Sequence, residues 1–355
     1  MRKLSSIQFI KNIESIPNAD KIELATIRDW KVVIQKGLHS IGDKIVYFEI
    51  DSFLPVIEAF DFLLKGTKVK KLLIDGEEKE GIRLRTIKLR GQISQGLIMP
   101  LTILDGLKYE NDDRENPKYS DQEGKDVSEL LGVYKYERPI PACIAGEVKG
   151  YFPAFIPKTD EERIQNLGDA LSRIKGYEMF ITSKLDGTSA TYFRRDGVFG
   201  VCSRNLELKE TEDNVFWVIA KKYKLDEILE DNMCIQGEIV GPGIQSNPLK
   251  LSEFELFVYN VFNINEQKYL SYVELCKYLA LKKLKMVPVI NDEFIIDHTV
   301  EQLLELANAK SPLNDKVDQE GIVIRPLIER TETVNRVMTR LSFKVISNNY
   351  LLKHE

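Results

Sequence analysis

The first hundred residues contain short apolar runs at close spacing, and turn-forming residues break the runs before any long helix could form. In several runs apolar and polar residues alternate, as in a strand with one buried face. The clearest are IELATI (22–27), WKVVIQ (30–35), KIVYFEI (44–50), GIRLRTIKL (81–89) and GLIMPL (96–101). Several short strands at this spacing predict a small β-barrel or β-sandwich.

The second half of the chain has a different pattern, because segments of helical period separate its strand-like runs. Helices are expected at 160–174, 213–231, 271–284 and 299–310. The alternation is too irregular for a doubly wound sheet, so we expect a mixed α+β domain. The length of 355 residues suits two domains, and ERPIPA (137–142), with two prolines, is the predicted boundary. The expected domains are therefore 1–140 and 141–355.

The composition excludes several classes of protein. With 43% hydrophobic and 30% charged residues the chain can bury a sizeable core, and no 18-residue apolar run predicts a membrane span. The N-terminus has no apolar region typical of a secretory signal. The four cysteines are far apart and form no CxxC pair, so we expect neither a disulfide scaffold nor a zinc site. A cytoplasmic monomer is the expectation.

The net charge of −5 excludes a simple polycation, so any binding of nucleic acid has to come from local patches. Residues 65–90 and 325–353 each carry more Lys and Arg than Asp and Glu. Such patches can attract phosphates. The alternative is a pair of solvated faces, and charge alone favours that interpretation.

Polar clusters at the ends of expected strands carry the chemistry of the second half. They are Lys184-Leu185-Asp186-Gly187, Ser203-Arg204-Asn205, Gln236-Gly237-Glu238, Glu320-Gly321 and Phe343-Lys344. Three carboxylates can hold a hydrated Mg²⁺, and lysine and arginine match the charge of phosphate. A lysine can also attack as a covalent nucleophile once it is neutral. These residues indicate phosphoryl or nucleotidyl transfer with a metal.

The same clusters resemble, in order, the motifs of the covalent nucleotidyltransferases, which include polynucleotide ligases and mRNA-capping enzymes. Motif I is similar to Lys184-x-Asp186-Gly187, and the others follow as SRN (203–205), QGEIVG (236–241), FVYNVF (257–262), EGIVIR (320–325) and SFK (342–344). The N-terminal tract with IPNADKIELATI, the segment PKTDEERIQN (157–166) and the terminal NNYLLK further resemble the fifth RNA ligase family, the Naegleria and Deinococcus type. This resemblance implies an N-terminal OB-fold β-barrel followed by a nucleotidyltransferase domain of antiparallel sheets flanked by helices.

The resemblance also implies roles for single residues, with ATP and Mg²⁺ or Mn²⁺ as cofactors. The implied catalytic residues are Lys184, Asp186, Arg204, Glu238, Glu320 and Lys344. The implied nucleotide-binding residues are Lys184, Arg163, Gly187, Arg204, Glu238, Phe257, Tyr259 and Lys344. The implied metal-binding residues are Asp186, Glu238 and Glu320, which would act through the water shell of the ion.

Some of these assignments have ordinary structural alternatives. Arg163 lies in the expected helix 160–174, where it could simply pair with a residue one turn away. Phe257 and Tyr259 are both candidates to stack on adenine, but an aromatic residue on a strand also suits a core.

The last motif departs from the pattern of many relatives, which carry two lysines spaced Lys-x-Lys. Here Lys344 is followed by Val345 and Ile346. Either Lys344 acts alone on the α-phosphate, or Arg340 or Lys353 assists it.

The sequence therefore predicts an ATP-dependent RNA ligase that joins 3′-hydroxyl and 5′-phosphate ends through a lysyl-AMP intermediate. By the resemblance, its substrate is a nicked duplex with RNA on the 3′-hydroxyl side, as in RNA repair. One alternative is a capping-type or DNA-sealing nucleotidyltransferase. Another is an inactive OB-type nucleic-acid-binding protein, because IPNADKIELATI is also similar to tRNA-binding OB domains.

Overall fold

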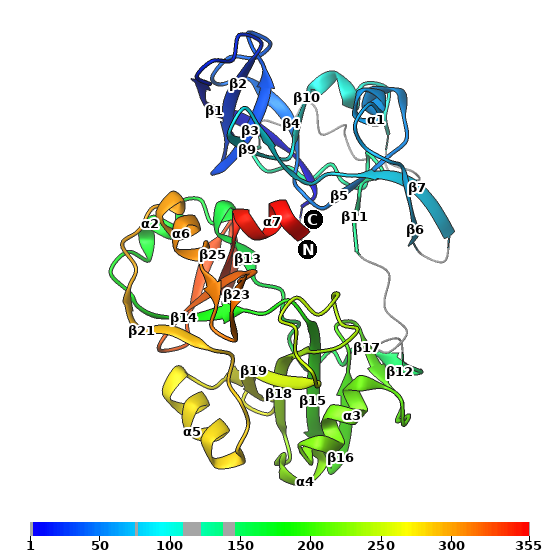
Figure 1. Ribbon diagram of the computed structural model, residues 1–355, viewed down its shortest axis with the longest axis vertical. Helices are drawn as coiled ribbons and strands as arrows, with labels where there is room; N and C mark the ends of the chain where they lie inside the picture. Colours follow the sequence, from blue (N-terminus) through cyan, green and yellow to red (C-terminus); the bar gives the residue numbers. More distant parts are fainter. Residues whose placement is uncertain (1–2, 75–76, 109–121, 138–145, 355) are drawn as a thin grey trace. The chain divides into compact units, whose positions relative to one another are not determined.

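The computed structural model describes residues 3–74, 77–108, 122–137 and 146–354. By their contacts the residues form two compact units, Met1–Pro139 with Leu351–Glu355, and Ile140–Tyr350 (Figure 1). The boundary predicted between residues 140 and 141 lies outside the described residues. Among the described helices, none has the length and apolar character needed to cross a bilayer.

The N-terminal unit is built around a five-stranded antiparallel sheet in the order β10-β4-β1-β2-β3. Its strands are β1 (Ser5–Ser15), β2 (Ile22–Ile27), β3 (Trp30–Gln35), β4 (Lys44–Phe48) and β10 (Leu97–Pro100). The first part of β1 pairs with β4 and the rest pairs with β2, with a register shift between Ile10 and Asn12. Such an irregularity bends a strand and lets one strand serve two directions of pairing. The strands predicted at 22–27 and 30–35 are confirmed.

A second sheet of the same unit has the order β11-β5-β7-β6. Its strands are β5 (Ser52–Pro55), β6 (Lys70–Ile74), β7 (Glu77–Arg83) and β11 (Tyr134–Lys135). The single strand predicted at 81–89 is wrong, because β7 ends at Arg83 and β8 (Thr86–Leu89) starts a separate hairpin with β9 (Gln92–Gln95). Leu84 still bonds to Asp51 and Ser52 beside β5, and the chain then changes partner, since Thr86 pairs with Gln95 of β9.

The second unit contains two larger sheets. The seven-stranded sheet, in the order β12-β17-β16-β15-β18-β19-β20, consists of β12 (Val148–Tyr151), β15 (Thr188–Arg195), β16 (Val198–Cys202), β17 (Leu206–Leu208), β18 (Met233–Val240), β19 (Glu255–Asn263) and β20 (Lys268–Tyr269). The five-stranded sheet, in the order β13-β27-β24-β14-β21, consists of β13 (Glu162–Arg163), β14 (Glu178–Lys184), β21 (Val289–Ile295), β24 (Gly321–Pro326) and β27 (Phe343–Ile346). All the strand pairs in these two sheets are antiparallel except β13 with β27.

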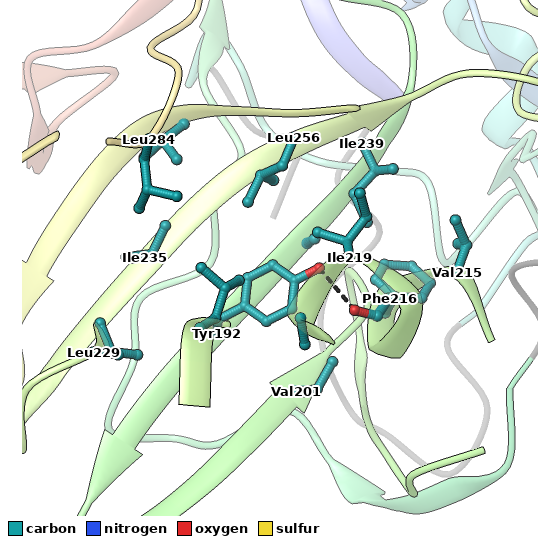
Figure 2. Packing of buried hydrophobic residues seen from close by; sticks show 14 of the residues in the cluster. Tyr192, Val201, Val215, Phe216, Ile219, Leu229, Ile235, Ile239, Leu256 and Leu284 are labelled. Carbon is teal, nitrogen blue, oxygen red and sulfur yellow. Dashed lines mark hydrogen bonds between the residues drawn. The ribbon is translucent and has the colours of Figure 1, made fainter. Parts of the chain in front are cut away.

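Helices cover one face of the seven-stranded sheet and enclose the largest apolar core of this unit. They are α3 (Val215–Lys222), α4 (Leu225–Ile228) and α5 (Tyr272–Lys282). Figure 2 shows Tyr192 in this core, where its hydroxyl donates to the Phe216 carbonyl at 3.0 Å. The helices predicted within 213–231 and 271–284 are confirmed, although Lys224, with φ +50°, separates α3 from α4.

The five-stranded sheet likewise buries one face, here against α6 (Val300–Ala307) and α2 (Ala170–Arg173) (Figure 1). The helix predicted at 299–310 is confirmed as α6. The helix predicted at 160–174 is wrong, because this segment holds the strand β13, a 3₁₀ turn (Ile164–Asn166) and only the short α2. Its apolar spacing arises because Ile164 and Leu167 enter the core beside a strand pairing with β27, and Gly168 turns the chain at φ +54°.

Candidate active site

Lys184 lies where the chain leaves one sheet and enters the other. It is the last residue of β14 in the five-stranded sheet, and β15 of the seven-stranded sheet begins at Thr188. The antiparallel register sets Lys184 opposite Gly321, the first residue of β24, so Glu320 arrives beside it. The Lys184 Nζ donates to both carboxylate oxygens of Glu320, at 2.7 and 2.8 Å.

The seven-stranded sheet supplies a second carboxylate. Glu238 lies on β18, opposite Ser189 of β15, and its Oε1 accepts from the Gly187 N–H at 3.2 Å. A side chain at Gly187 would not fit, because a Cβ there would lie 2.3 Å from the Ile239 carbonyl oxygen. The glycine therefore allows the turn after Lys184 to approach β18 closely.

Electrostatically, Lys184 is a cation among three carboxyl groups, those of Glu320, Glu238 and Asp186. Burial lowers the pKa of Lys184, but the charges of Glu320, Glu238 and Asp186 outweigh burial and raise the pKa above its usual value. Burial raises the pKa of Glu238 to about 8 in spite of the nearby Lys184. The protein without nucleotide therefore holds Lys184 as a protonated ammonium, which has to lose its proton before it can attack.

The carboxylates have the right chemistry for a hard divalent cation, since Mg²⁺ and Mn²⁺ prefer oxygen ligands. In the part of the chain that the structure describes, however, no three His, Cys, Asp or Glu side chains converge as a direct ligand set.

The polar face of the five-stranded sheet carries two further predicted residues. Ile181, Ile164 and Phe343 belong to the core on one face, so the alternation of a strand places Lys184, Arg163 and Lys344 on the other face. Lys344 is paired with Val323 across β24 and, in parallel, with Arg163 across β13. The structure thus brings Arg163 and Lys344 to the same sheet face as Lys184, and the helical alternative for Arg163 is wrong.

The two aromatic candidates differ in their surroundings. Phe257 is only 7% exposed and belongs to an apolar cluster with Leu185 and Val240. The Tyr259 hydroxyl is within hydrogen-bond distance of Ser189, at 2.9 Å, and of Thr159, at 3.3 Å. Phe257 therefore supports the turn after Lys184, while Tyr259 ties β19 to β15 and to the segment before β13.

Arg204 and Arg340 are not brought to Lys184 by any contact described for them. Arg204 lies between β16 and β17, is 45% exposed in its side chain, and pairs with Asp160 at 2.5 Å. Arg340 pairs with Glu329 and lies 3.7 Å from the Tyr269 ring centroid. These contacts give Arg340 a structural role. They disfavour Arg340 as the residue that replaces the second lysine of the last motif.

One residue beside the site has no counterpart among the predicted site residues. The Tyr350 hydroxyl donates to Asp186 Oδ2, and the Tyr350 ring is buried. Tyr350 lies in α7 (Asn348–His354), within the NNYLLK tract that carried part of the resemblance. That tract was therefore a signal for the region, but nothing in it indicated a contact with Asp186.

Part of the predicted basic patch at residues 65–90 has acidic partners. Arg83 pairs with Asp51 at 2.8 Å, and Lys71 pairs with Glu78 at 2.7 Å. Lys71 thus fits the interpretation as a solvated face, whereas Arg83 is only 9% exposed in its side chain and is held by Asp51.

Comparison with known proteins agrees with both halves of the chain. An OB-fold domain model matches residues 4–101, and a family model described as RNA ligase matches residues 177–346. The comparison with curated proteins finds no significant match. The OB-fold followed by a nucleotidyltransferase domain, as expected from the sequence, is thus confirmed.

Several solved structures are similar over the whole length. A Naegleria gruberi RNA ligase mutant without ligand is 38% identical, with a TM-score of 0.86 over 100% of this chain and 99% of that one. Another mutant of that ligase, with ATP and Mn, is 38% identical, with a TM-score of 0.85 over 99% of each chain. The same ligase with pyrophosphate is 38% identical, with a TM-score of 0.86 over 100% of this chain and 99% of that one.

Proposed function

The chain belongs to the RNA ligase family of ATP-dependent enzymes, and we propose that it joins a 3′-hydroxyl end to a 5′-phosphate end by three nucleotidyl transfers. First, the neutral Lys184 amine attacks the α-phosphorus of ATP, a phosphoramidate bond forms and pyrophosphate leaves. Second, the 5′-phosphate of the nucleic acid takes the AMP and frees Lys184. Third, the 3′-hydroxyl attacks that 5′-phosphorus and AMP leaves. The similar ligase has been captured with ATP and Mn, with AMP and Mn, and with pyrophosphate, which supports the first transfer.

The observation that carries this proposal is the imbalance of charge around Lys184. A structural ion pair would need only Glu320, yet Glu238 and Asp186 also act on the ammonium. We assign Asp186, Glu238 and Glu320 to a hydrated Mg²⁺ or Mn²⁺, which supplies positive charge that favours the neutral amine and stabilises the phosphates. The chain's own residues then orient the reacting atoms and neutralise charge, with little need for a general base.

The remaining residues divide between nucleotide and nucleic acid. Lys344 and Arg163, on the same sheet face as Lys184, are assigned to the phosphates of ATP. Tyr259 is assigned to the adenine side, with Phe257 behind it in the apolar cluster. Arg204 is exposed on a connecting turn, so we assign it to the RNA end rather than to the first transfer.

The proposed substrate is a nicked duplex with RNA on the 3′-hydroxyl side, met during RNA repair in the cytoplasm. The OB-fold supports this choice, because OB-folds bind nucleic acid through one sheet face and its loops. It gives the protein a second surface for nucleic acid.

Sealing of defined nicks tests the proposal. The protein would be incubated with ATP and Mg²⁺ or Mn²⁺ and a 5′-labelled nick that has either RNA or DNA at the 3′-hydroxyl. We expect a joined strand with RNA at that end and none from Lys184→Ala. Equal sealing with DNA would favour the DNA-sealing alternative, and an enzyme that takes AMP but seals no nick would overturn the ligase assignment.

A further inference from the structure

A bulge in β19 sets two consecutive side chains on one face of the seven-stranded sheet. Gln236 is paired with Asn260 but Gly237 with Val258, so Tyr259 is an extra residue in β19. Bulges re-aim side chains and are common next to active sites. Val258 and Val261, on either side, both point into the core. Tyr259 and Asn260 therefore both point away from the core, toward the polar face of the five-stranded sheet.

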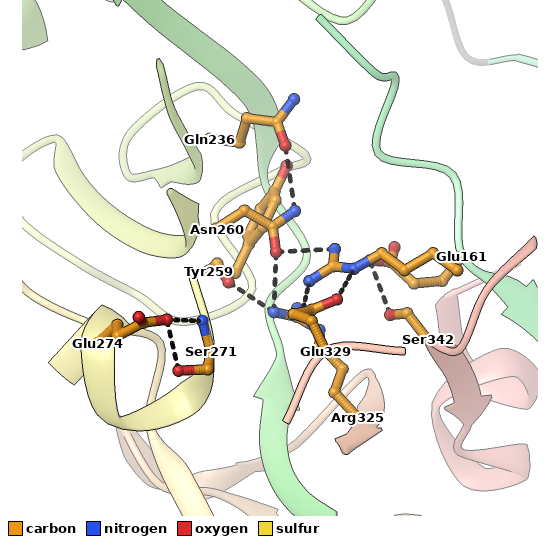
Figure 3. Close-up of polar contacts among 10 residues, drawn as sticks. Glu161, Gln236, Tyr259, Asn260, Ser271, Glu274, Arg325, Glu329 and Ser342 are labelled. Atoms are coloured by element: carbon orange, nitrogen blue, oxygen red, sulfur yellow. Dashed lines mark hydrogen bonds and ion pairs between the residues drawn. The ribbon is translucent and has the colours of Figure 1, made fainter. Parts of the chain in front are cut away.

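Two arginines contact the bulge: Arg325 lies in β24, and Arg340 is the last residue of β26 (Val337–Arg340). The Arg325 Nη1 donates to the Tyr259 carbonyl at 2.5 Å and to Asn260 Oδ1 at 3.1 Å (Figure 3). The Arg340 Nη1 donates to the same Oδ1 at 3.0 Å. Because a guanidinium only donates, these contacts fix the Asn260 amide with its oxygen toward the arginines and its nitrogen toward Gln236.

The fixed amide passes this orientation on. Asn260 Nδ2 donates to Gln236 Oε1 at 3.1 Å, and Gln236 Nε2 in turn donates to the Pro157 carbonyl at 2.8 Å. Gln236 and Asn260 are 0% and 2% exposed, so the hydrogen bond between them is shielded from water. We call this chain of donors the amide relay, from Arg325 and Arg340 through Asn260 and Gln236 to Pro157.

Pro157 begins the segment that leads to β13, and the hydrogen bond from Gln236 holds the start of this segment. Along this segment Thr159 is bonded to Tyr259, Asp160 pairs with Arg204, and Arg163 lies beside Lys344. A shift of the Pro157 carbonyl would therefore disturb the segment that carries Arg163 and the Asp160 partner of Arg204, without touching Lys184 or its carboxylates.

We propose that Gln236 and Asn260 are positioning residues whose amide relay holds segment 157–163 in place, and with it Arg163, for the transfer of AMP to Lys184. The proposal deepens the function proposed above and rests on it. Neither side chain touches the reacting atoms, so their effect is on the binding of ATP more than on the chemical step.

Asn260→Asp tests the relay, because an aspartate keeps the hydrogen bonds from the two arginines and loses the hydrogen bond to Gln236. The carboxylate still accepts from both guanidinium groups, but it cannot donate to Gln236. The Gln236 amide then has to turn its nitrogen toward position 260, which leaves its oxygen facing the Pro157 carbonyl. We expect a KM for ATP raised ~2–10-fold, measured well below the melting temperature of the variant, the worth of about one buried hydrogen bond. The kcat of adenylylation should change less than KM.

Hydrogen exchange gives a readout that is independent of activity. In Asn260→Asp the amides of residues 158–163 should exchange faster, while those of β14 should be unchanged. The matched control is Asn214→Asp, which is isosteric, buried in the same unit and still able to cap α3 through the N–H of Phe216. This control should match the wild type in both assays.

The outcomes separate the relay from the function it rests on. An Asn260→Asp protein with wild-type KM and wild-type exchange at 158–163 would overturn the relay while leaving the ligase assignment intact. Asn260→Ala is expected to lose activity in proportion to a lower melting temperature. The same proportional loss in Asn260→Asp would make the role of Asn260 merely structural and would equally overturn the relay. A wild-type protein that forms no AMP adduct would instead remove the proposed function.

Discussion

Two clusters of charged side chains lie in the second unit, and they differ in their balance of charge. The relay cluster has two cations and two carboxylates, namely Arg325, Arg340, Glu161 and Glu329. The Lys184 cluster has one cation, Lys184, and three carboxyl groups, Asp186, Glu238 and Glu320; Glu238, with its pKa of about 8, holds its proton at neutral pH, so two charged carboxylates face one ammonium. A balanced buried cluster satisfies its own charges and can hold a structure together. An unbalanced cluster is complete only with further positive charge, which is typical of a site for a metal and a nucleotide.

The largest expected effect comes from the unbalanced cluster. Glu320→Gln keeps the size of the side chain but removes the carboxylate that holds Lys184 Nζ. We expect adenylylation to slow by roughly 10²–10³-fold, as when one preorganised electrostatic contact is lost, with little change in the melting temperature. Single-turnover labelling with ATP measures the rate. A rate within a factor of three of the wild type would contradict the difference drawn between the clusters.

The balanced cluster should show the opposite behaviour. Arg340→Ala leaves Glu329 without its partner and removes one donor to Asn260. We expect a loss of about 2–3 kcal/mol in the free energy of unfolding, or roughly 5–10 °C in melting temperature. The rate per folded molecule should fall by less than tenfold. Lys221→Ala breaks an exposed pair with Glu210 and serves as the control, with almost no change.

The pH dependence of stability should distinguish the clusters again. Glu238 has a pKa of about 8 in the folded protein, above its usual value of 4.5, so the folded state binds its proton more tightly. Its contribution to stability is complete below pH 4.5 and is lost as the pH rises toward 8. Without nucleotide or metal, the wild type should lose melting temperature over this range more steeply than Glu238→Gln. Parallel curves for the two proteins would show that burial does not shift this carboxyl.

The smallest effect is expected at the edge of the Lys184 cluster. Tyr350→Phe removes the hydroxyl that donates to Asp186 and keeps the buried ring. We expect adenylylation to slow ~3–10-fold, the worth of one hydrogen bond to a charged group, and the requirement for metal to rise. Tyr278, in α5, donates a similar hydrogen bond to Glu230. Tyr278→Phe removes this bond and should leave both the rate of adenylylation and the requirement for metal unchanged. An equal loss in the two variants would assign the Tyr350 bond to stability alone.

Much of the site could be predicted because its residues follow from strand ends and their order. Lys184, Glu238 and Glu320 each stand at or beside a strand whose alternation is legible in the sequence, and the sheets bring them together. The strand β13 could not be predicted, because two residues become a strand only by pairing with β27, in which Lys344 lies 181 positions after Arg163. The apolar residues of segment 160–174 have helical spacing only because Ile164 and Leu167 both pack into the core.

The bulge and the hydroxyl contact were also beyond the sequence. One extra residue in β19 is visible only once its register with β18 is known, and without it Asn260 would point into the core. Tyr350 reaches Asp186 across 164 residues of chain, so neither local period nor spacing indicates the contact. Both features depend on tertiary pairing, which local patterns do not encode.

The most direct test of the account is whether Lys184 takes AMP. The wild type, Lys184→Ala and Lys175→Ala, an exposed lysine paired with Asp297, would be incubated with α-labelled ATP or GTP and Mg²⁺ or Mn²⁺. Intact mass would be measured beside the label. We predict one AMP on the wild type and on Lys175→Ala, none on Lys184→Ala, and none from GTP. An adduct that survives in Lys184→Ala, or no adduct on the wild type with either metal, would contradict the assignment of Lys184 as the nucleophile.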